Sequence, residues 1–122
     1  LLTMYQYKVK LDRIIDGDTI DCYIDLGFDI QTKKRIRFAG INTPESRTRD
    51  LEEKKKGLAA KARLKEILEE ASEIHLDSHG LGKYGRVIGQ LHISTENSPT
   101  MVNVNELLIT EGHAVEYHGG KR

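Results

Sequence analysis

The feature that most constrains the fold is a series of alternating apolar and polar residues in the first 41 positions. Segments 5–11, 19–26 and 32–41 each alternate with a period of two, which is typical of strands with one buried face. Turn-forming residues 16–18 separate the first two segments. Pro44 cannot donate a hydrogen bond to a strand ladder, so the third strand ends before it. These patterns predict three strands, with a hairpin between the second and third.

The second half of the chain changes period. Residues 46–56 are strongly charged and predict a surface loop, whereas 57–72 place apolar residues at helical spacing. Asn103 is a suitable cap for a short helix that Gly112 would end. Between the two helices the pattern predicts a strand at 73–77, a glycine-rich loop at 79–85, a second strand at 86–93 and a turn at 96–99.

The predicted order is three strands, a helix, two strands and a short helix. Strands this short favour a small five-stranded barrel of the oligonucleotide-binding (OB-fold) type, mainly β with α (α+β), with two to three packed helices. At 122 residues the chain is expected to be a single domain, 1–122, with one modest core. Its tail, 116–122, is polar with two adjacent glycines and is expected to fray.

Composition narrows the function classes. The 19 basic and 19 acidic side chains cancel, which disfavours a protein that coats nucleic-acid phosphates nonspecifically. Cys22 is the single cysteine, so no internal disulfide is possible. No apolar run is long enough to span a membrane, so no membrane partner is expected. A monomer without an obligate protein partner is expected. The compartment stays open: cytoplasmic, or secreted with a trimmed signal peptide.

The residues that carry chemistry cluster at the two ends of stretch 16–45. It opens with Asp16-Gly17-Asp18-Thr19 and closes with Arg37 and Asn42-Thr43-Pro44-Glu45. A hairpin between the two ends would bring carboxylates, a guanidinium and further oxygen ligands together. This combination suits a hard cation beside a phosphate.

These motifs, together with Lys83-Tyr84-Gly85-Arg86, resemble the staphylococcal nuclease (thermonuclease) family in order and spacing, from about Val9 to Ala114. The resemblance implies an SNase-like domain, a five-stranded OB-fold barrel with helices. It also implies a calcium-dependent endonuclease, a hydrolase of DNA and RNA phosphodiesters that leaves 3′-phosphate ends. The partner would be nucleic acid, with single strands preferred.

Each site residue takes a role from the resemblance. Asp18, Asn42 and the Thr43 backbone carbonyl would hold Ca²⁺, Arg37 and Arg86 would bind the phosphate, and Glu45 would act as general base for water. Lys83 and Tyr84 would line the nucleotide site. Asp16 would either support the metal ligands from behind or only form the turn. Tyr117 lies near the position of another aromatic residue of the family.

Every one of these residues also has a structural interpretation. Asp18 suits a turn, Arg37 and Arg86 suit exposed strand or loop positions, and Glu45 suits the first turn of a helix. Tyr84 suits half-buried packing.

Asn42 departs from the family, because its best-known members carry aspartate there. The amide keeps an oxygen ligand but removes one negative charge, so weaker calcium binding is expected. This leaves an alternative: a weakened domain that binds nucleic acid or a protein partner without cleavage. A third hypothesis, an OB-fold barrel unrelated to nucleases, requires stacking aromatic residues on its strands.

Overall fold

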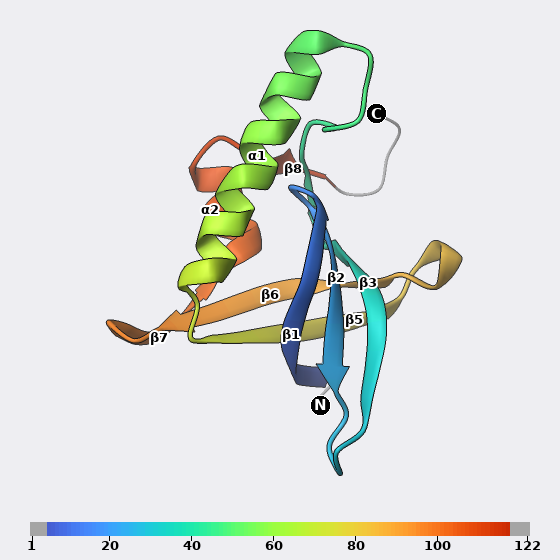
Figure 1. Ribbon diagram of the computed structural model, residues 1–122, viewed down its shortest axis with the longest axis vertical. Helices are drawn as coiled ribbons and strands as arrows, with labels where there is room; N and C mark the ends of the chain where they lie inside the picture. Colours follow the sequence, from blue (N-terminus) through green and yellow to red (C-terminus); the bar gives the residue numbers. More distant parts are fainter. Residues whose placement is uncertain (1–4, 118–122) are drawn as a thin grey trace.

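The computed structural model describes residues 5–117, without the side chains of Tyr5, Lys83, Ser98 and Pro99. Its centre is a barrel of five strands (Figure 1). The strands are β1 (Tyr5–Asp16), β2 (Thr19–Asp25), β3 (Gln31–Phe38), β5 (Glu73–Leu81) and β6 (Val87–Thr95). This arrangement confirms the predicted class, mainly β with α.

The barrel closes through one parallel contact. β1 pairs antiparallel with β2 and β5, β2 with β3, and β5 with β6. β3 then pairs with β6 in parallel, with Ile36 opposite Val87 and Phe38 opposite Gly89. Outside the barrel, β7 (Ser98–Asn103) extends from β6, and β4 (Ile41–Asn42) pairs with β8 (Val115–Glu116).

Two helices pack on this barrel. Helix α1 (Leu51–Glu70) buries Ala60, Leu64, Ile67 and Leu68, while its charged residues cover the outer face. Helix α2 (Val104–Thr110) buries Val104 and Leu108. They meet a core whose largest members are fully buried: Phe38, Ile20, Ile36, Ile41, Leu76 and Leu91. None of the helices within residues 5–117 is both long and apolar enough to cross a membrane.

Helix boundaries follow the caps. Asn103 caps α2 as predicted, accepting from the Glu106 N–H. Gly112 follows in the left-handed region at φ 83°, its N–H bonded to the Ile109 carbonyl. The predicted surface loop 46–56 is wrong from Leu51 onward. Asp50 accepts from the N–H groups of the first turn and starts α1 there.

Two other expectations also need correction. β5 continues to Leu81, through the start of the predicted glycine-rich loop, because Gly80 and Leu81 pair with β6. β7 was missed, since it contains Pro99, which strands tolerate at a sheet edge. In the tail that was expected to fray, Glu116 pairs with Ile41 in β8, and the Tyr117 N–H donates to the Gly40 carbonyl. Residues 118–122 lie outside the described part.

A charge cluster ties the outer face of the β1–β2–β3 meander together. Asp21 is buried and accepts from Arg35 Nε at 2.8 Å and from Arg13 Nε at 3.1 Å. The hydrogen bond from Arg35 is the main cause that lowers the pKa of the Asp21 carboxyl below its ordinary 3.8. A group with a lowered pKa stabilises the fold fully above its ordinary pKa, and this contribution is lost as pH falls through the folded-state value.

We therefore expect Asp21→Asn to lower the free energy of unfolding at pH 7 by about 2 kcal/mol, because the neutral amide keeps only one of the two oxygens that accept from Arg13 and Arg35. Asp12→Asn, which removes the surface pair with Lys33, should have a smaller effect. Urea unfolding at pH 7 and at decreasing pH below 3.8 would measure both. The difference between wild type and Asp21→Asn should shrink as the Asp21 carboxyl becomes protonated; an equal difference at every pH would contradict this assignment.

Candidate active site

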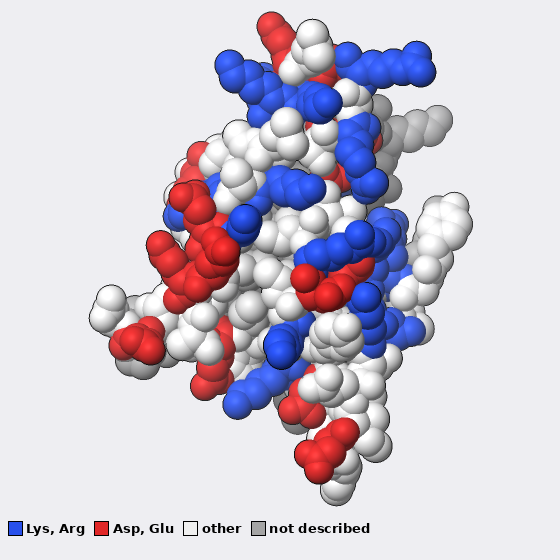
Figure 2. Space-filling view, viewed as in Figure 1, with Lys and Arg blue, Asp and Glu red and all other residues white. Residues whose placement is uncertain are grey.

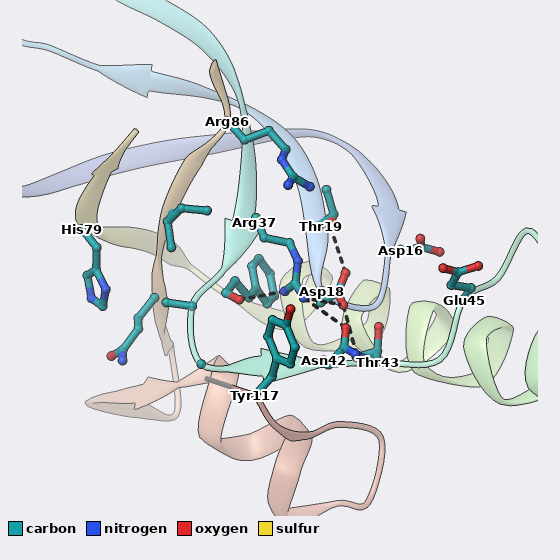
Figure 3. A pocket seen from close by; sticks show the side chains of 15 residues that line it. Asp16, Asp18, Thr19, Arg37, Asn42, Thr43, Glu45, His79, Arg86 and Tyr117 are labelled. Carbon is teal, nitrogen blue, oxygen red and sulfur yellow. Dashed lines mark hydrogen bonds and ion pairs between the residues drawn. The ribbon is translucent and has the colours of Figure 1, made fainter. Parts of the chain in front are cut away.

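An open cleft of about 770 Å³ lies where the β1–β2 turn, the end of β3, β4 and the start of β6 meet (Figure 3). It gathers most of the residues that the sequence singled out. The residues that line it are Asp16, Asp18, Thr19, Arg37, Phe38, Ala39, Gly40, Asn42, Thr43, Glu45, His79, Arg86, Ile88, Gln90 and Tyr117.

Asp18 is buried at the floor of this cleft. Its Oδ1 accepts from Thr19 Oγ1 at 2.9 Å, and its Oδ2 accepts from the Thr43 N–H at 3.0 Å. The Asp18 carbonyl also accepts from the Phe38 N–H. These contacts fix the carboxylate in one orientation and join the β1–β2 turn to the segment after β4. Asp18 therefore does more than form a turn.

Arg37 crosses the cleft beside Asp18. Its terminal nitrogen NH2 lies 3.5 Å from Asp18 Oδ2 and donates to Asn42 Oδ1 at 3.1 Å. NH1 donates to the Phe38 carbonyl at 2.8 Å, and the guanidinium lies 6.0 Å from the centre of the Tyr117 ring. The side chain is only 17% exposed. Arg37 is therefore not the exposed strand arginine of the structural interpretation.

Asp16 and Glu45 lie together at one end of the cleft (Figure 3). Asp16 Oδ1 accepts from the Ser46 N–H at 3.3 Å and from the Ser46 hydroxyl. Since Ser46 directly follows Glu45, these bonds fix the backbone that carries the exposed Glu45 side chain. Asp16 thus has a contact beyond its own turn.

Helix α1 supports the same segment from behind. A Cβ on Gly57 would lie 2.4 Å from the Glu45 carbonyl oxygen, and a Cβ on Gly17 would lie 2.8 Å from Ala60 Cβ. Both glycines therefore allow the helix to press directly against the site's backbone. Gly57 is needed because a side chain would not fit there. Its backbone is that of a regular helix, which any residue can adopt.

Arg86 lies between the single-turn helix Lys83–Gly85 and the first residue of β6. Its Nε is buried, and among residues 5–117 it has no hydrogen-bond partner. Figure 3 shows its guanidinium directed into the cleft that Arg37 also lines. Arg37 on β3 and Arg86 just before β6 are 49 positions apart in sequence, and the parallel β3–β6 pairing brings them to one place.

Of the two predicted substrate residues, only Tyr84 has a described side chain. It is 93% exposed and does not line this cleft, because its backbone takes the left-handed conformation at φ 62° and directs the side chain outward. The alternative interpretation of Tyr84 as half-buried packing is therefore wrong. The side chain of Lys83 lies outside the description.

The structure also adds residues that the sequence did not assign. Thr19, His79 and Gln90 line the cleft, and Tyr117, which the sequence placed only approximately, lies over Arg37. Thr19 belongs to the motif that begins at Asp16, so the sequence could have identified it as a residue of the cleft. The two-residue pairing of β4 with β8 places Tyr117 at the cleft, and no pattern in the sequence indicates this pairing.

A cation in this cleft would meet oxygen groups from the residues that the sequence singled out: the Asp18 carboxylate, the Asn42 amide and the Thr43 carbonyl, with Asp16 and Glu45 adding charge nearby. This chemistry fits a hard divalent ion such as Ca²⁺. Within residues 5–117, no group of three or more His, Cys, Asp or Glu side chains is placed to hold a metal. A cation here would therefore depend on amide, backbone, water or phosphate oxygens besides Asp18.

Comparisons with known proteins identify the family of this chain. The model of the family described as "Staphylococcal nuclease homologue" matches residues 35–122. Protein ParB of Escherichia coli is 31% identical over 119 residues, which cover 93% of this chain and 60% of ParB. Micrococcal nuclease of Shigella flexneri is 27% identical over 117 residues, 91% of this chain and 59% of that protein. Endonuclease YhcR of Bacillus subtilis (strain 168) is 30% identical over 119 residues, 92% of this chain but 9% of YhcR. The chain thus spans about three fifths of the first two relatives.

The close approach of α1 gives a test. Gly→Ala inside an exposed helix ordinarily stabilises a protein by about 0.5–1 kcal/mol. Because a Cβ on Gly57 would collide with the Glu45 backbone, we expect Gly57→Ala to destabilise the protein by about 1–3 kcal/mol instead. Urea unfolding of wild type and variant would give the sign of the change. A stabilising effect would show that the helix does not press on this segment.

Proposed function

The chain belongs to the staphylococcal nuclease homologue family, and from this premise we propose that it is a nuclease that hydrolyses phosphodiester bonds in DNA and RNA. The observation that carries the proposal is the meeting of Arg37 and Arg86 in one open cleft with Asp18 and Glu45. Two relatives named as a nuclease and an endonuclease support it.

The two arginines would bind the phosphate. Planar guanidinium groups bind two phosphate oxygens and stabilise the charge that develops during attack. Arg86 suits this role because its buried Nε has no partner among the described residues, so a phosphate would satisfy a donor that is otherwise left unpaired. Arg37 would bind the same phosphate from β3, where its guanidinium is already oriented by Asn42 and the Phe38 carbonyl.

Glu45 would take the proton from the attacking water. It is exposed to the cleft, and Asp16 holds its backbone through Ser46. Attack of water on phosphorus would break the bond to the 5′-oxygen, which departs with negative charge and then takes a proton from solvent water. The products would be a 3′-phosphate and a 5′-hydroxyl end, with Arg86 countering charge on the leaving oxygen.

Asp18, Asn42 and the Thr43 carbonyl would hold Ca²⁺. A bound divalent cation supplies charge neutralisation at the phosphate and lowers the pKa of coordinated water. The protein's own contribution is a buried carboxylate that two hydrogen bonds keep in one orientation. We further propose that the chain forms a single nuclease domain, acts as a monomer and prefers single strands.

The main test is cleavage of single-stranded DNA and RNA in millimolar calcium, with a chelator control. We expect Glu45→Gln to lower kcat about 10²–10⁴-fold, because general base catalysis supplies that factor. Arg86→Ala should lower kcat to a similar degree through lost charge stabilisation. Glu52→Gln, on the exposed first turn of α1, is the matched control and should cleave as wild type does.

Results with the wild-type protein separate this proposal from its alternative. Binding of single-stranded DNA without any cleavage in calcium would identify a weakened domain that only binds. The feature that favours this alternative is Asn42, which lowers the charge of the metal ligands. Full activity in chelator would contradict calcium dependence while leaving the nuclease assignment in place.

Asn42→Asp tests the metal ligands directly. The added carboxylate raises the negative charge beside Asp18 while keeping an acceptor for Arg37. Because ligand charge tunes calcium affinity over decades, we expect the dissociation constant to fall by about tenfold or more. Isothermal titration calorimetry with calcium would measure it, with Asp18→Asn as the opposite variant. Equal affinities in wild type and both variants would remove Asp18 and Asn42 from the metal site.

A further inference from the structure

The outer edge of β3 is open over its first half. β3 pairs with β2 from Gln31 to Arg37, but its pairing with β6 begins only at Ile36. Among the described residues, the stretch 31–34 therefore has a neighbouring strand on one side only. Figure 1 shows this half of β3 continuing into the β2–β3 hairpin, which projects beyond the barrel.

The hydrogen bonds at the end of β3 indicate which backbone groups face the open edge. Phe38 donates its N–H to the turn before β2, whereas Ala39 donates its N–H to the Gly89 carbonyl of β6. Successive residues of a strand direct their backbone groups to opposite edges, so the odd-numbered residues of β3 face away from β2. Gln31 and Lys33 therefore direct both N–H and C=O to the open edge, where a further strand could pair with them.

The inner face of the hairpin carries an apolar strip that leads out of the core. Leu26 and Ile30, which share a backbone hydrogen bond, are 46% and 56% exposed. Lys34 lies on the same face as Ile30, because it is opposite the buried Cys22 and an even number of positions away. Along the open edge, an apolar side chain and a cation thus lie four positions apart, a separation of about 13 Å.

This edge is also cationic. Figure 2 shows Lys and Arg side chains gathered over β2 and β3. Lys33 and Arg35 are each paired with a carboxylate, but within the described part of the chain Lys34 takes part in no ion pair. Beside Lys34 lies a groove of about 580 Å³, whose far wall includes Arg86 of the active-site cleft.

We propose that this edge binds an extended segment of a partner protein as an additional strand. The backbone of the segment would pair with Gln31 and Lys33, an apolar side chain would cover Ile30, and an acidic side chain four positions away would bind Lys34. A second copy of this chain does not suit the edge, because pairing the edge with itself would bring cations together.

A strand in this position would reach into the groove that Arg86 shares with the cleft. The partner would therefore inhibit cleavage by excluding nucleic acid. This consequence rests on the proposed function, whereas the strand pairing itself does not.

The probes are two peptides with blocked ends, Thr-Val-Thr-Thr-Thr-Glu-Thr and its reverse, which suit the two possible strand directions. Titration of the isotope-labelled full chain would follow the amide chemical shifts. We expect one of the peptides to shift the amides of Gln31 and Lys33 saturably and to slow their exchange with solvent. Replacing its glutamate by glutamine should weaken binding about tenfold, because a hydrogen bond between charged groups is lost.

Lys34→Glu tests the charge from the side of the protein. It should weaken binding of the glutamate peptide about tenfold or more and favour the same peptide with lysine in place of glutamate. Lys65→Glu, the same change on the exposed face of α1, is the control and should bind as wild type does.

Backbone methylation tests the strand pairing. Two versions of the bound peptide would carry N-methyl groups on alternate nitrogens. A strand directs only one set of nitrogens toward β3, so one version should lose binding and the other should keep it. Equal effects of the two sets would overturn the strand pairing.

The remaining outcomes separate this inference from the proposed function. Peptides that leave the Gln31 and Lys33 amides unshifted, or that bind Lys34→Glu as tightly as wild type, would overturn it. Shifts there with an oligonucleotide but with neither peptide would assign the edge to nucleic acid and also overturn it. In calcium, the bound peptide should raise the apparent KM for single-stranded DNA without lowering kcat; unchanged cleavage would contradict the inhibition. Strand pairing in a protein without nuclease activity would support the edge and contradict the proposed reaction.

Discussion

The parallel pairing of β3 with β6 is the contact on which the rest of the structure depends. It closes the barrel, and it places Arg37 and Arg86 beside one cleft. On the other side of β6, Gly89 allows the close approach of β5, since a Cβ there would lie 2.5 Å from the Asp77 carbonyl oxygen. The buried Asn105 secures the junction: its Nδ2 donates to the Ala39 carbonyl at 2.8 Å. Its Oδ1 accepts from the Leu91 N–H at 3.3 Å, so the amide joins both strands to α2.

The site combines structural and chemical roles in the same groups. Asp18 is a buried carboxylate, and a buried charge is costly unless it is paired and hydrogen bonded. Arg37, Thr19 and the Thr43 N–H supply those partners. Removing Arg37 would therefore disturb the fold as well as any reaction. Arg86 is not among these partners of Asp18, so a substitution there reports more directly on chemistry.

Local patterns predicted most elements, and the motifs predicted most of the cleft. Alternation placed β2 and β3, and helical spacing placed the buried face of α1. Asp18, Arg37, Glu45 and Arg86 were each found by their motif, and all four line one cleft. The start of α1 was missed because charged residues after Asp50 were interpreted as a loop, although Asp50 is itself a strong capping signal.

Features that depend on contacts distant in sequence could not be predicted. The pairing of Ile36 with Val87 joins segments about fifty positions apart, and no local pattern encodes it. The same holds for Tyr117, which a two-residue strand brings over Arg37. Tyr84 does not line the cleft, and no local pattern indicates the left-handed backbone that directs its side chain outward.

Asn42 is best understood from the charge balance around Arg37. The guanidinium lies 3.5 Å from one carboxylate, that of Asp18, and bonds to the neutral amide of Asn42 at 3.1 Å. One cation therefore meets one anion, and the pair is balanced without a metal. An aspartate at position 42 would place two carboxylates on the same guanidinium and leave an uncompensated negative charge that favours a bound cation. If the proposed function holds, Asn42 therefore weakens calcium binding, and Arg37 alone balances the charge of Asp18.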